Sequence, residues 1–411
     1  MAGKINKLGW ILSSLNVALI FVNLGLWLIA WCQGLIWRAD FTMLYTGGAI
    51  LHDGLGARLY DLDLQAQYQQ QILEGSSFVD GVLPFNYPSY VALLIAPLTL
   101  FPLTQAFGFW TLLQAGLLVW LLRRLWHLSA DWDPLERRAL LIAVLAFTPL
   151  LNTILLGSFS LLLLVSWVEG YVQLKSLREG YAGLCLTLGA LKPQSVLAFG
   201  VALLGARRWR SLALMAMVGC LVFIGTTLAL GLHIWRDFFM LLLEIGKVFD
   251  AMGIVLPDMH NFRGMLAGFL GPMHLPLINT LSISVFIGTV LWILWAWRGS
   301  WNLQSAVFPL RLAVTCALGL FFSLHLYPQD SLLWVFPAFL GYVYVRGMPR
   351  LRHYYGLFLL NWPWFFLLDQ FAPLRIAGIR PAVFLFIVLL FWLGILLRRC
   401  MIANSESAHS L

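Results

Sequence analysis

The chain has 411 residues, of which 61% are hydrophobic and only 11% are charged. Soluble proteins carry about 25% charged residues and about 45–50% apolar ones. These values exclude a soluble domain, a disordered chain and a fibrous one, and the long continuous apolar blocks disfavour a transmembrane barrel. The formal net charge of +8 indicates basic cytoplasmic loops rather than nucleic-acid binding, because excess Lys and Arg mark the cytoplasmic side of membrane proteins.

A helix needs about 20 apolar residues to cross a bilayer. Apolar blocks predict spans near 10–31, 106–122, 139–156, 158–174, 211–232, 276–297, 305–325, 330–345, 354–371 and 381–397. A shorter pair of blocks at 180–206 is interrupted by Lys192-Pro193, and proline disfavours helix in the residue before it. This pair is therefore expected to form a broken hairpin. With its two arms, the sequence predicts an all-α, polytopic protein of about 12 spans that forms a single integral membrane domain over 1–411.

Most Lys and Arg residues fall on one side of this arrangement, together with both ends of the chain. The positive-inside rule then predicts cytoplasmic N and C termini. Residues 1–9 carry two lysines before an apolar block that is too long for a signal peptide, so the first helix is expected to be uncleaved. Two long loops, at 32–105 and 233–275, lie on the outer side, and loops of this length are usually functional.

The first outer loop has helical patterns of its own. Apolar residues recur at helical spacing from Phe41 to Leu51, and a glutamine-rich stretch runs from Leu62 to Leu73. Both segments are expected to be amphipathic helices on the outer membrane surface. The stretch 89–101 is too short to span and is expected to dip into the interface.

Several short motifs follow one another in a characteristic order. They are Arg38-Ala39-Asp40-Phe41, Leu59-Tyr60-Asp61, Phe85-Asn86-Tyr87-Pro88, Lys192-Pro193-Gln194 and Asn261-Phe262-Arg263-Gly264. This order resembles the GT-C membrane glycosyltransferases of family 87, which depend on polyprenyl-phosphate sugars. The chain departs from the family pattern at two places, where Tyr-Pro-Pro reads Tyr87-Pro88-Ser89 and Gly-Gln reads Gly157-Ser158.

The resemblance implies a GT-C-like fold and a defined reaction class. A hexose or pentose, with mannose as the first expectation, would pass with inversion from a polyprenyl-phosphate donor to a lipid-linked or envelope glycan. The expected partners are this donor, a glycolipid or glycan acceptor and membrane lipids, at the outer face of the bacterial cytoplasmic (inner) membrane. The sugar, the acceptor and the oligomeric state stay open.

Glycosyl transfer needs a base for the acceptor hydroxyl and cationic groups for the departing phosphate. Asp40, just outside the first predicted span, is the candidate base, and the resemblance places the family's catalytic aspartate there. The alternative is a solvated carboxylate that caps the helix beginning at Phe41. Lys192 is the candidate phosphate anchor, because a lysine inside an apolar hairpin is costly and usually functional. Its alternatives are a snorkelling side chain and a structural pair with an aspartate.

Further binding candidates lie in the outer segments. His325, Tyr327, Gln329 and Asp330 surround Pro328 at the outer junction of two spans, where they form either a phosphate or sugar site or an ordinary wet turn. His260, Asn261 and Arg263 lie in the second outer loop, and Arg263 is the best phosphate ligand of the three because its fork binds two oxygens. Tyr87 is a further binding candidate because it belongs to the motif Phe85-Asn86-Tyr87-Pro88.

No cofactor is expected, and no metal site. Asp61 and Asp63 form a D-x-D string, but a lipid monophosphate donor has less need of a divalent ion than a nucleotide sugar, and no other ligand set accompanies the string. The chain also lacks a P-loop and a G-x-G-x-x-G motif, which argues against an ATP-driven pump and a cytoplasmic nucleotide-sugar donor.

Two other function classes stay open. A secondary transporter or lipid-carrier flippase would suit about 12 spans and a broken hairpin, although the second half of the chain shows no counterpart to Lys192-Pro193. A non-catalytic scaffold that has kept the fold would suit the two altered motifs, although Asp40 is intact.

Overall fold

The computed structural model describes residues 2–33, 40–73, 82–245, 255–299, 302–371 and 375–409. Within these ranges the regular elements are all helical, and the single β-bridge joins Ile376 and Ile379. Arg38 and Ala39 of the first motif lie outside the described residues, as does part of the second outer loop. The predicted all-α fold is confirmed for the part of the chain that the structure describes.

The helices of the first half, in chain order, are α1 (Ala2–Cys32), α2 (Asp40–His52), η2 (Gly56–Arg58), α3 (Leu62–Ile72), α4 (Ser89–Ile95), η3 (Ala96–Leu100), α5 (Leu103–Leu128), α6 (Pro134–Ala146), α7 (Thr148–Leu156), α8 (Ser160–Lys175), α9 (Glu179–Leu186), η4 (Thr187–Leu191) and α10 (Pro193–Gly205). Those of the second half are α11 (Trp209–Leu230), α12 (His233–Ile245), η6 (Leu256–Asp258), α13 (Phe262–Leu270), η7 (Pro272–His274), α14 (Leu275–Ala296), α15 (Val307–Phe321), η8 (Pro328–Trp334), α16 (Val335–Val345), α17 (Pro349–Phe371) and α18 (Pro381–His409).

Several of these helices are long and apolar enough to cross a membrane. Among the described residues there are 5 such helices, namely Leu8–Cys32 of α1, α5, α11, α14 and Pro381–Cys400 of α18, or up to 6 if one bent pair counts as a span. Other predicted crossings are shorter apolar helices, such as α10 and α15. The protein is therefore a helical membrane protein, while the count of about 12 spans stays a prediction.

The predicted span at 139–156 is not one continuous helix. It consists of α6 and α7, which meet at Phe147 with a bend of 45°. Pro149 at the start of α7 explains the break, because proline lacks the N–H that would continue the helical hydrogen bonds and its ring crowds the preceding turn. The bend directs α7 toward η8, where Thr153 donates a hydrogen bond of 3.0 Å to the carbonyl of Gln329.

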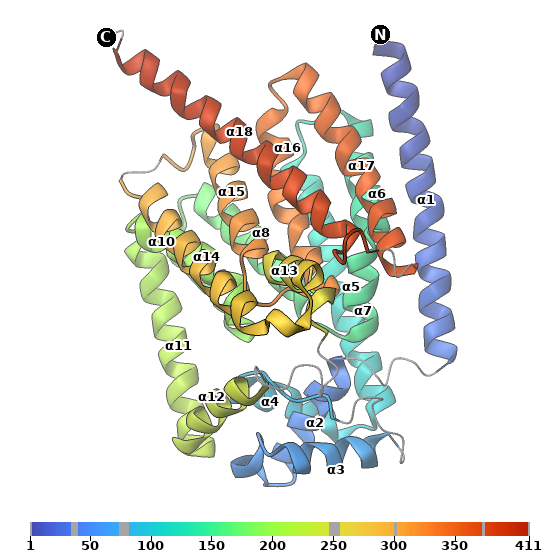
Figure 1. The fold of residues 1–411 in the computed structure, drawn as a ribbon, viewed down its shortest axis with the longest axis vertical. Coiled ribbons are helices and arrows are strands. Elements are labelled where there is room, and N and C mark those ends of the chain that lie inside the picture. The colour runs from blue at the N-terminus through green and yellow to red at the C-terminus, as the bar shows by residue number, and fades with distance from the viewer. Residues whose placement is uncertain are drawn as a thin grey trace.

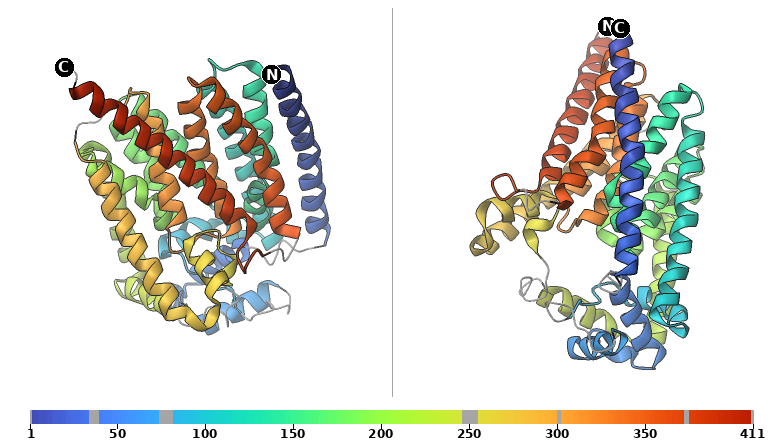
Figure 2. Two further views of the ribbon diagram at one scale, coloured as in Figure 1. Left: turned by 45° about the horizontal axis from the view of Figure 1, so that its top comes forward. Right: turned by 90° about the vertical axis from the view of Figure 1, so that its right-hand side faces the viewer.

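The two ends of the molecule are formed by different parts of the chain (Figure 1). Both termini lie at one end, and α2, α3 and α12 lie at the other, as the views of Figure 2 also show. Basic residues near several turns form ion pairs, such as Arg346 with Asp131 at 2.6 Å and Arg208 with Glu179 at 2.6 Å. We call the end that holds the termini the basic end; its placement in the cytoplasm stays a prediction.

The segment 40–73 is folded differently from the predicted pair of surface helices. α2 is buried from Phe41 to Gly48, so this helix is a core element of that end rather than the amphipathic surface helix that its sequence suggested. α3 does have an exposed face, and its buried glutamines bind backbone groups. Gln65 accepts from the N–H of Phe85 at 2.7 Å, and Gln69 accepts from the N–H of Leu83 at 3.0 Å. These side chains hold the irregular backbone segment that leads to Tyr87.

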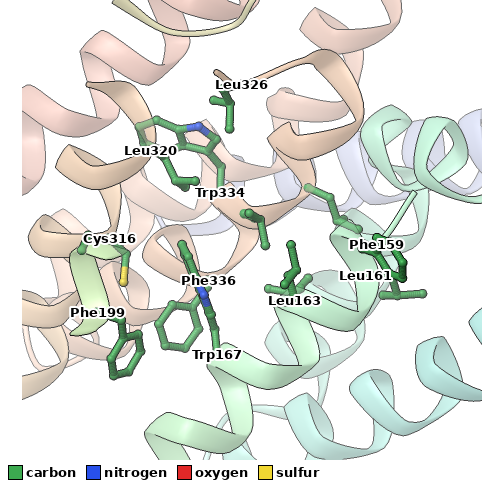
Figure 3. Close-up of a cluster of buried hydrophobic side chains, with 14 of the residues drawn as sticks. Phe159, Leu161, Leu163, Trp167, Phe199, Cys316, Leu320, Leu326, Trp334 and Phe336 are labelled. Atoms are coloured by element: carbon green, nitrogen blue, oxygen red, sulfur yellow. The ribbon is translucent and has the colours of Figure 1, made fainter. Parts of the chain in front are cut away.

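A dense apolar core contains side chains of α8, α10, α15 and α16 (Figure 3). Trp167 of α8 lies against Phe336 of α16, and the two rings meet edge to face with centroids 5.8 Å apart. Trp334, the last residue of η8, stacks on Phe386 of α18 with ring centroids 4.1 Å apart. Since both Trp334 and Phe336 are fully buried, this core fixes the position of η8, which carries polar residues at its other end.

Candidate active site

A buried ion pair lies at the centre of the candidate site. Lys192 is the residue at which the chain breaks between η4 and α10, and Asp330 lies in the first turn of η8. The Lys192 ammonium is 2.6 Å from Oδ1 and 2.5 Å from Oδ2 of Asp330, and both residues are buried. Burying two charges is costly unless they are paired and further hydrogen-bonded. The aspartate partner anticipated as an alternative for Lys192 is therefore present, and it is Asp330.

Serine side chains complete the surroundings of this pair. Ser160, the first residue of α8, donates a hydrogen bond of 2.7 Å to Asp330 Oδ1. The Ser158 and Ser160 hydroxyls are 2.8 Å apart. Ser158 belongs to the altered Gly157-Ser158 motif, so this departure from the family pattern keeps a polar group beside the ion pair. Sequence reasoning missed Ser160, although the polar Ser158-x-Ser160 before an apolar helix was a visible signal.

Asp40, from the N-terminal part of the chain, lies near the Lys192–Asp330 pair. Its Oδ2 accepts a hydrogen bond of 3.0 Å from Gln329 Nε2, and the carboxylate lies within electrostatic range of Lys192 and Asp330. Burial raises the pKa of Asp40 to about 6, an effect that the charge of Lys192 and the Gln329 hydrogen bond partly offset. As the first residue of α2, Asp40 also lies at the positive end of the helix dipole.

A close backbone approach fixes the start of α2. Gly157 ends α7 with a φ of +71°, and a Cβ built on it would lie 2.6 Å from the Cβ of Phe41. Only glycine fits both the left-handed backbone and the contact. Trp110 donates to the carbonyl of Gly157 at 2.9 Å. Contacts from α5 and α7 therefore fix the position of Phe41, which follows Asp40.

Tyr87 and His325 surround the same cluster. Tyr87 is buried, packs edge-on against Phe159 at 5.5 Å, and lies within electrostatic range of Lys192, Asp40 and Asp330. His325 lies within range of Lys192, Asp330 and Arg263. The structure thus brings together six of the predicted residues, with Arg263 near His325; the six are Asp40, Tyr87, Lys192, His325, Gln329 and Asp330.

Arg263 is held by the segment that precedes His325. Its guanidinium donates to the carbonyl of Leu324 at 3.2 Å and to Asn279 Oδ1 at 2.7 Å. Its positive charge lies within electrostatic range of His325 and Tyr327. The arginine therefore lies on the α13 side of the cluster, next to the loop between α15 and η8.

His260 and Asn261 form hydrogen bonds that connect neighbouring helices. The Asn261 side chain caps α13 by accepting from the N–H of Gly264 at 2.9 Å, and it donates to the carbonyl of Ser323 at 2.8 Å. The His260 ring contacts Ser331 Oγ at 2.9 Å and Asp369 Oδ2 at 3.0 Å, and all three residues are buried. These contacts connect α13 and α17 to η8, one residue from Asp330.

The D-x-D string has a local structural explanation. Asp61 caps α3 by accepting from the N–H groups of Asp63 and Leu64, each at 3.1 Å. Its other oxygen accepts from Arg58 at 2.6 Å. A carboxylate at this position satisfies the free N–H groups of the first helical turn.

Comparison with known proteins identifies a family for the chain. The sequence model described as Glycosyltransferase family 87 matches residues 85–328, more than half of the chain. This match includes Tyr87, Lys192 and Arg263, while Asp40 precedes it and Asp330 follows it. Neither the curated proteins nor the solved structures contain a match. On the strength of the family match, the chain belongs to glycosyltransferase family 87.

Proposed function

We propose that this protein transfers a hexose or pentose from a polyprenyl-phosphate donor to a lipid-linked or envelope glycan. Mannose is the first sugar to test. The reaction would take place at the outer face of the bacterial cytoplasmic membrane. The observation that carries the proposal is the approach of a partly buried carboxylate, Asp40, to a buried ammonium, Lys192, in a helical membrane protein of a glycosyltransferase family.

The two groups fit the two charges that develop in the reaction. An acceptor hydroxyl oxygen attacks the anomeric carbon while the bond from that carbon to the phosphate oxygen breaks. The hydroxyl proton passes to Asp40, and the bonding electrons leave with the polyprenyl phosphate. This single displacement inverts the anomeric configuration. The pKa of Asp40, raised to about 6 by burial, makes it a better proton acceptor than a solvated aspartate near neutral pH.

Lys192 would hold the departing phosphate. An ammonium has three N–H donors, and the two Asp330 oxygens account for two of them at most. One donor therefore stays available for a phosphate oxygen. Arg263, on the α13 side of the cluster, and His325 would contact the remaining phosphate oxygens or the sugar. Tyr87 would form a wall of the same site.

A transfer assay with the protein in nanodiscs tests the proposal. It offers a panel of radiolabelled polyprenyl-phosphate sugars with total envelope lipid as acceptor, and compares the unaltered chain with Asp40→Asn. General-base catalysis contributes about 10²–10⁴-fold, so Asp40→Asn should reduce transfer by a factor in this range. Asp63→Asn is the matched control, because Asp63 is an exposed carboxylate of the same outer segment.

The outcomes separate the competing functions. Transfer by the unaltered chain and by Asp63→Asn, with loss in Asp40→Asn, supports the enzyme and its base and identifies the sugar. Full transfer by Asp40→Asn overturns the assigned base. If the folded protein transfers no sugar from any donor, the proposal fails, and proton-coupled uptake in vesicles with Lys192→Ala becomes the next test for a transporter.

A further inference from the structure

A cavity lies away from the candidate active site. Its volume is about 360 Å³, and it is formed by α1, α6, α16 and α17, which lie together in Figure 1. Its lining includes Trp10 of α1, Ala143 of α6 and Leu360 of α17, whereas Asp40, Lys192 and the residues around them do not line it. The volume falls within the range of about 300–1,000 Å³ that is typical of small-molecule sites.

Small residues create this space. The cavity is lined by several small residues, namely Gly9 and Ser13 of α1, Ala139 of α6 and Gly356 of α17. A Cβ built on Gly9 would meet nothing within 4 Å, and one built on Gly356 would meet only the Tyr342 ring, at 3.4 Å. The missing side chains therefore leave space between these helices. The wall is otherwise mainly aliphatic and aromatic, which suits a hydrocarbon chain.

Charged residues line part of the same cavity. Arg138, Arg352, His353 and Glu136 all belong to its lining, and they lie near the turns of the basic end. Arg352 pairs with Glu136 at 3.4 Å. Arg138 is exposed and forms no ion pair with any residue that the structure describes. Because Glu136 balances Arg352, Arg138 leaves this edge of the cavity with a net positive charge.

A buried polar atom in the wall also lacks a partner. Trp362 is 4% exposed and lines the cavity, and its indole N–H forms no hydrogen bond within the described ranges. A buried donor without a partner costs about 1–3 kcal/mol. An oxygen of a bound molecule, such as a glycerol ester carbonyl, would satisfy it.

We propose that this cavity binds an anionic glycerophospholipid of the surrounding bilayer. One acyl chain would fill the apolar cavity, and the phosphate would contact Arg138 beside the Arg352–Glu136 pair. Basic pockets between membrane helices on the cytoplasmic side bind anionic head groups in this way. The lipid would fasten α1, which packs on α6, α7 and α17 and directly precedes the segment that leads to Asp40.

Native mass spectrometry of the purified full chain tests this proposal. The detergent-solubilised protein is titrated separately with phosphatidylglycerol, phosphatidylcholine and polyprenyl phosphate. A Cβ at Gly9 meets nothing within 4 Å, so Gly9→Leu should occupy part of the cavity and reduce phosphatidylglycerol binding at least 10-fold. Gly25→Leu is the matched control, because Gly25 is in the same helix, also has nothing within 4 Å of its Cβ position, and is not part of the lining.

A second pair of variants tests the head-group contact independently. Arg138→Gln should remove the preference for phosphatidylglycerol over phosphatidylcholine. Arg123→Gln, which removes an exposed arginine of α5 that does not line the cavity, should leave the preference unchanged. Undiminished lipid binding by Gly9→Leu, an unchanged preference in Arg138→Gln, or tighter binding of polyprenyl phosphate than of phosphatidylglycerol would each overturn the proposal.

Discussion

Lys192 and Asp330 form a buried ion pair across 138 residues of sequence, with Nζ–Oδ distances of 2.5 and 2.6 Å. The pair joins the break between η4 and α10 to the first turn of η8. It therefore has two roles to separate: it holds two parts of the fold together, and it supplies the cation of the proposed site.

Substitutions of this pair should separate stability from activity. Lys192→Met or Asp330→Asn alone leaves one buried group without its partner and should destabilise the fold by about 3–5 kcal/mol. The double variant Lys192→Met/Asp330→Leu should recover much of this loss, because no unpaired charge remains, yet it should transfer no sugar. Thermal unfolding and the transfer assay check the two expectations. Activity in the double variant would exclude Lys192 as the phosphate ligand.

The rate of transfer should depend on pH through Asp40. Its pKa is raised to about 6, and only the ionised carboxylate accepts a proton. Transfer should therefore increase as the pH rises through about 6 and should be slow below it. Gln329→Leu removes a hydrogen bond that lowers this pKa, so the rise should move to higher pH. A rate that is constant between about pH 5 and 8 would contradict Asp40 as the base.

The glutamines of α3 should matter for the position of Tyr87. Gln65 is buried, donates to the carbonyl of Leu59 at 2.8 Å and accepts from the N–H of Phe85 at 2.7 Å. Gln65→Leu leaves both backbone groups buried without partners, at a cost of about 1–3 kcal/mol each. Limited proteolysis should then cut the segment before Tyr87 faster, and transfer should fall. Gln70→Leu, at an exposed position of the same helix, should change neither.

Gly157 should tolerate no side chain. Gly157→Ala forces a left-handed backbone on alanine, which costs about 1–2 kcal/mol, and its methyl group would displace Phe41 beside Asp40. We expect a lower unfolding temperature and weaker transfer. Gly108→Ala in α5 has open space around the Cβ position and should be neutral or slightly stabilising. Equal behaviour of the two variants would show that the contact with Phe41 is unimportant.

Properties that depend on neighbouring residues alone were predictable from the sequence. Long apolar blocks predicted α1, α5, α11, α14 and α18, because the length of apolar chain decides whether a helix can cross a bilayer. Lys192-Pro193 predicted the break before α10, because the proline ring and its missing N–H act on the adjacent turn. The resemblance also predicted the family, which the family match confirms.

Only the tertiary structure decided which of these segments meet. Asp40 and Gln329 are 289 residues apart, and no local pattern indicates their contact. The burial of α2 likewise depends on neighbouring helices, because an apolar helix has the same sequence pattern whether lipid or protein surrounds it. Asp330 illustrates the same limit: its sequence marks a polar turn, but its role as the partner of Lys192 follows from the packing of η8 against α7 and α8.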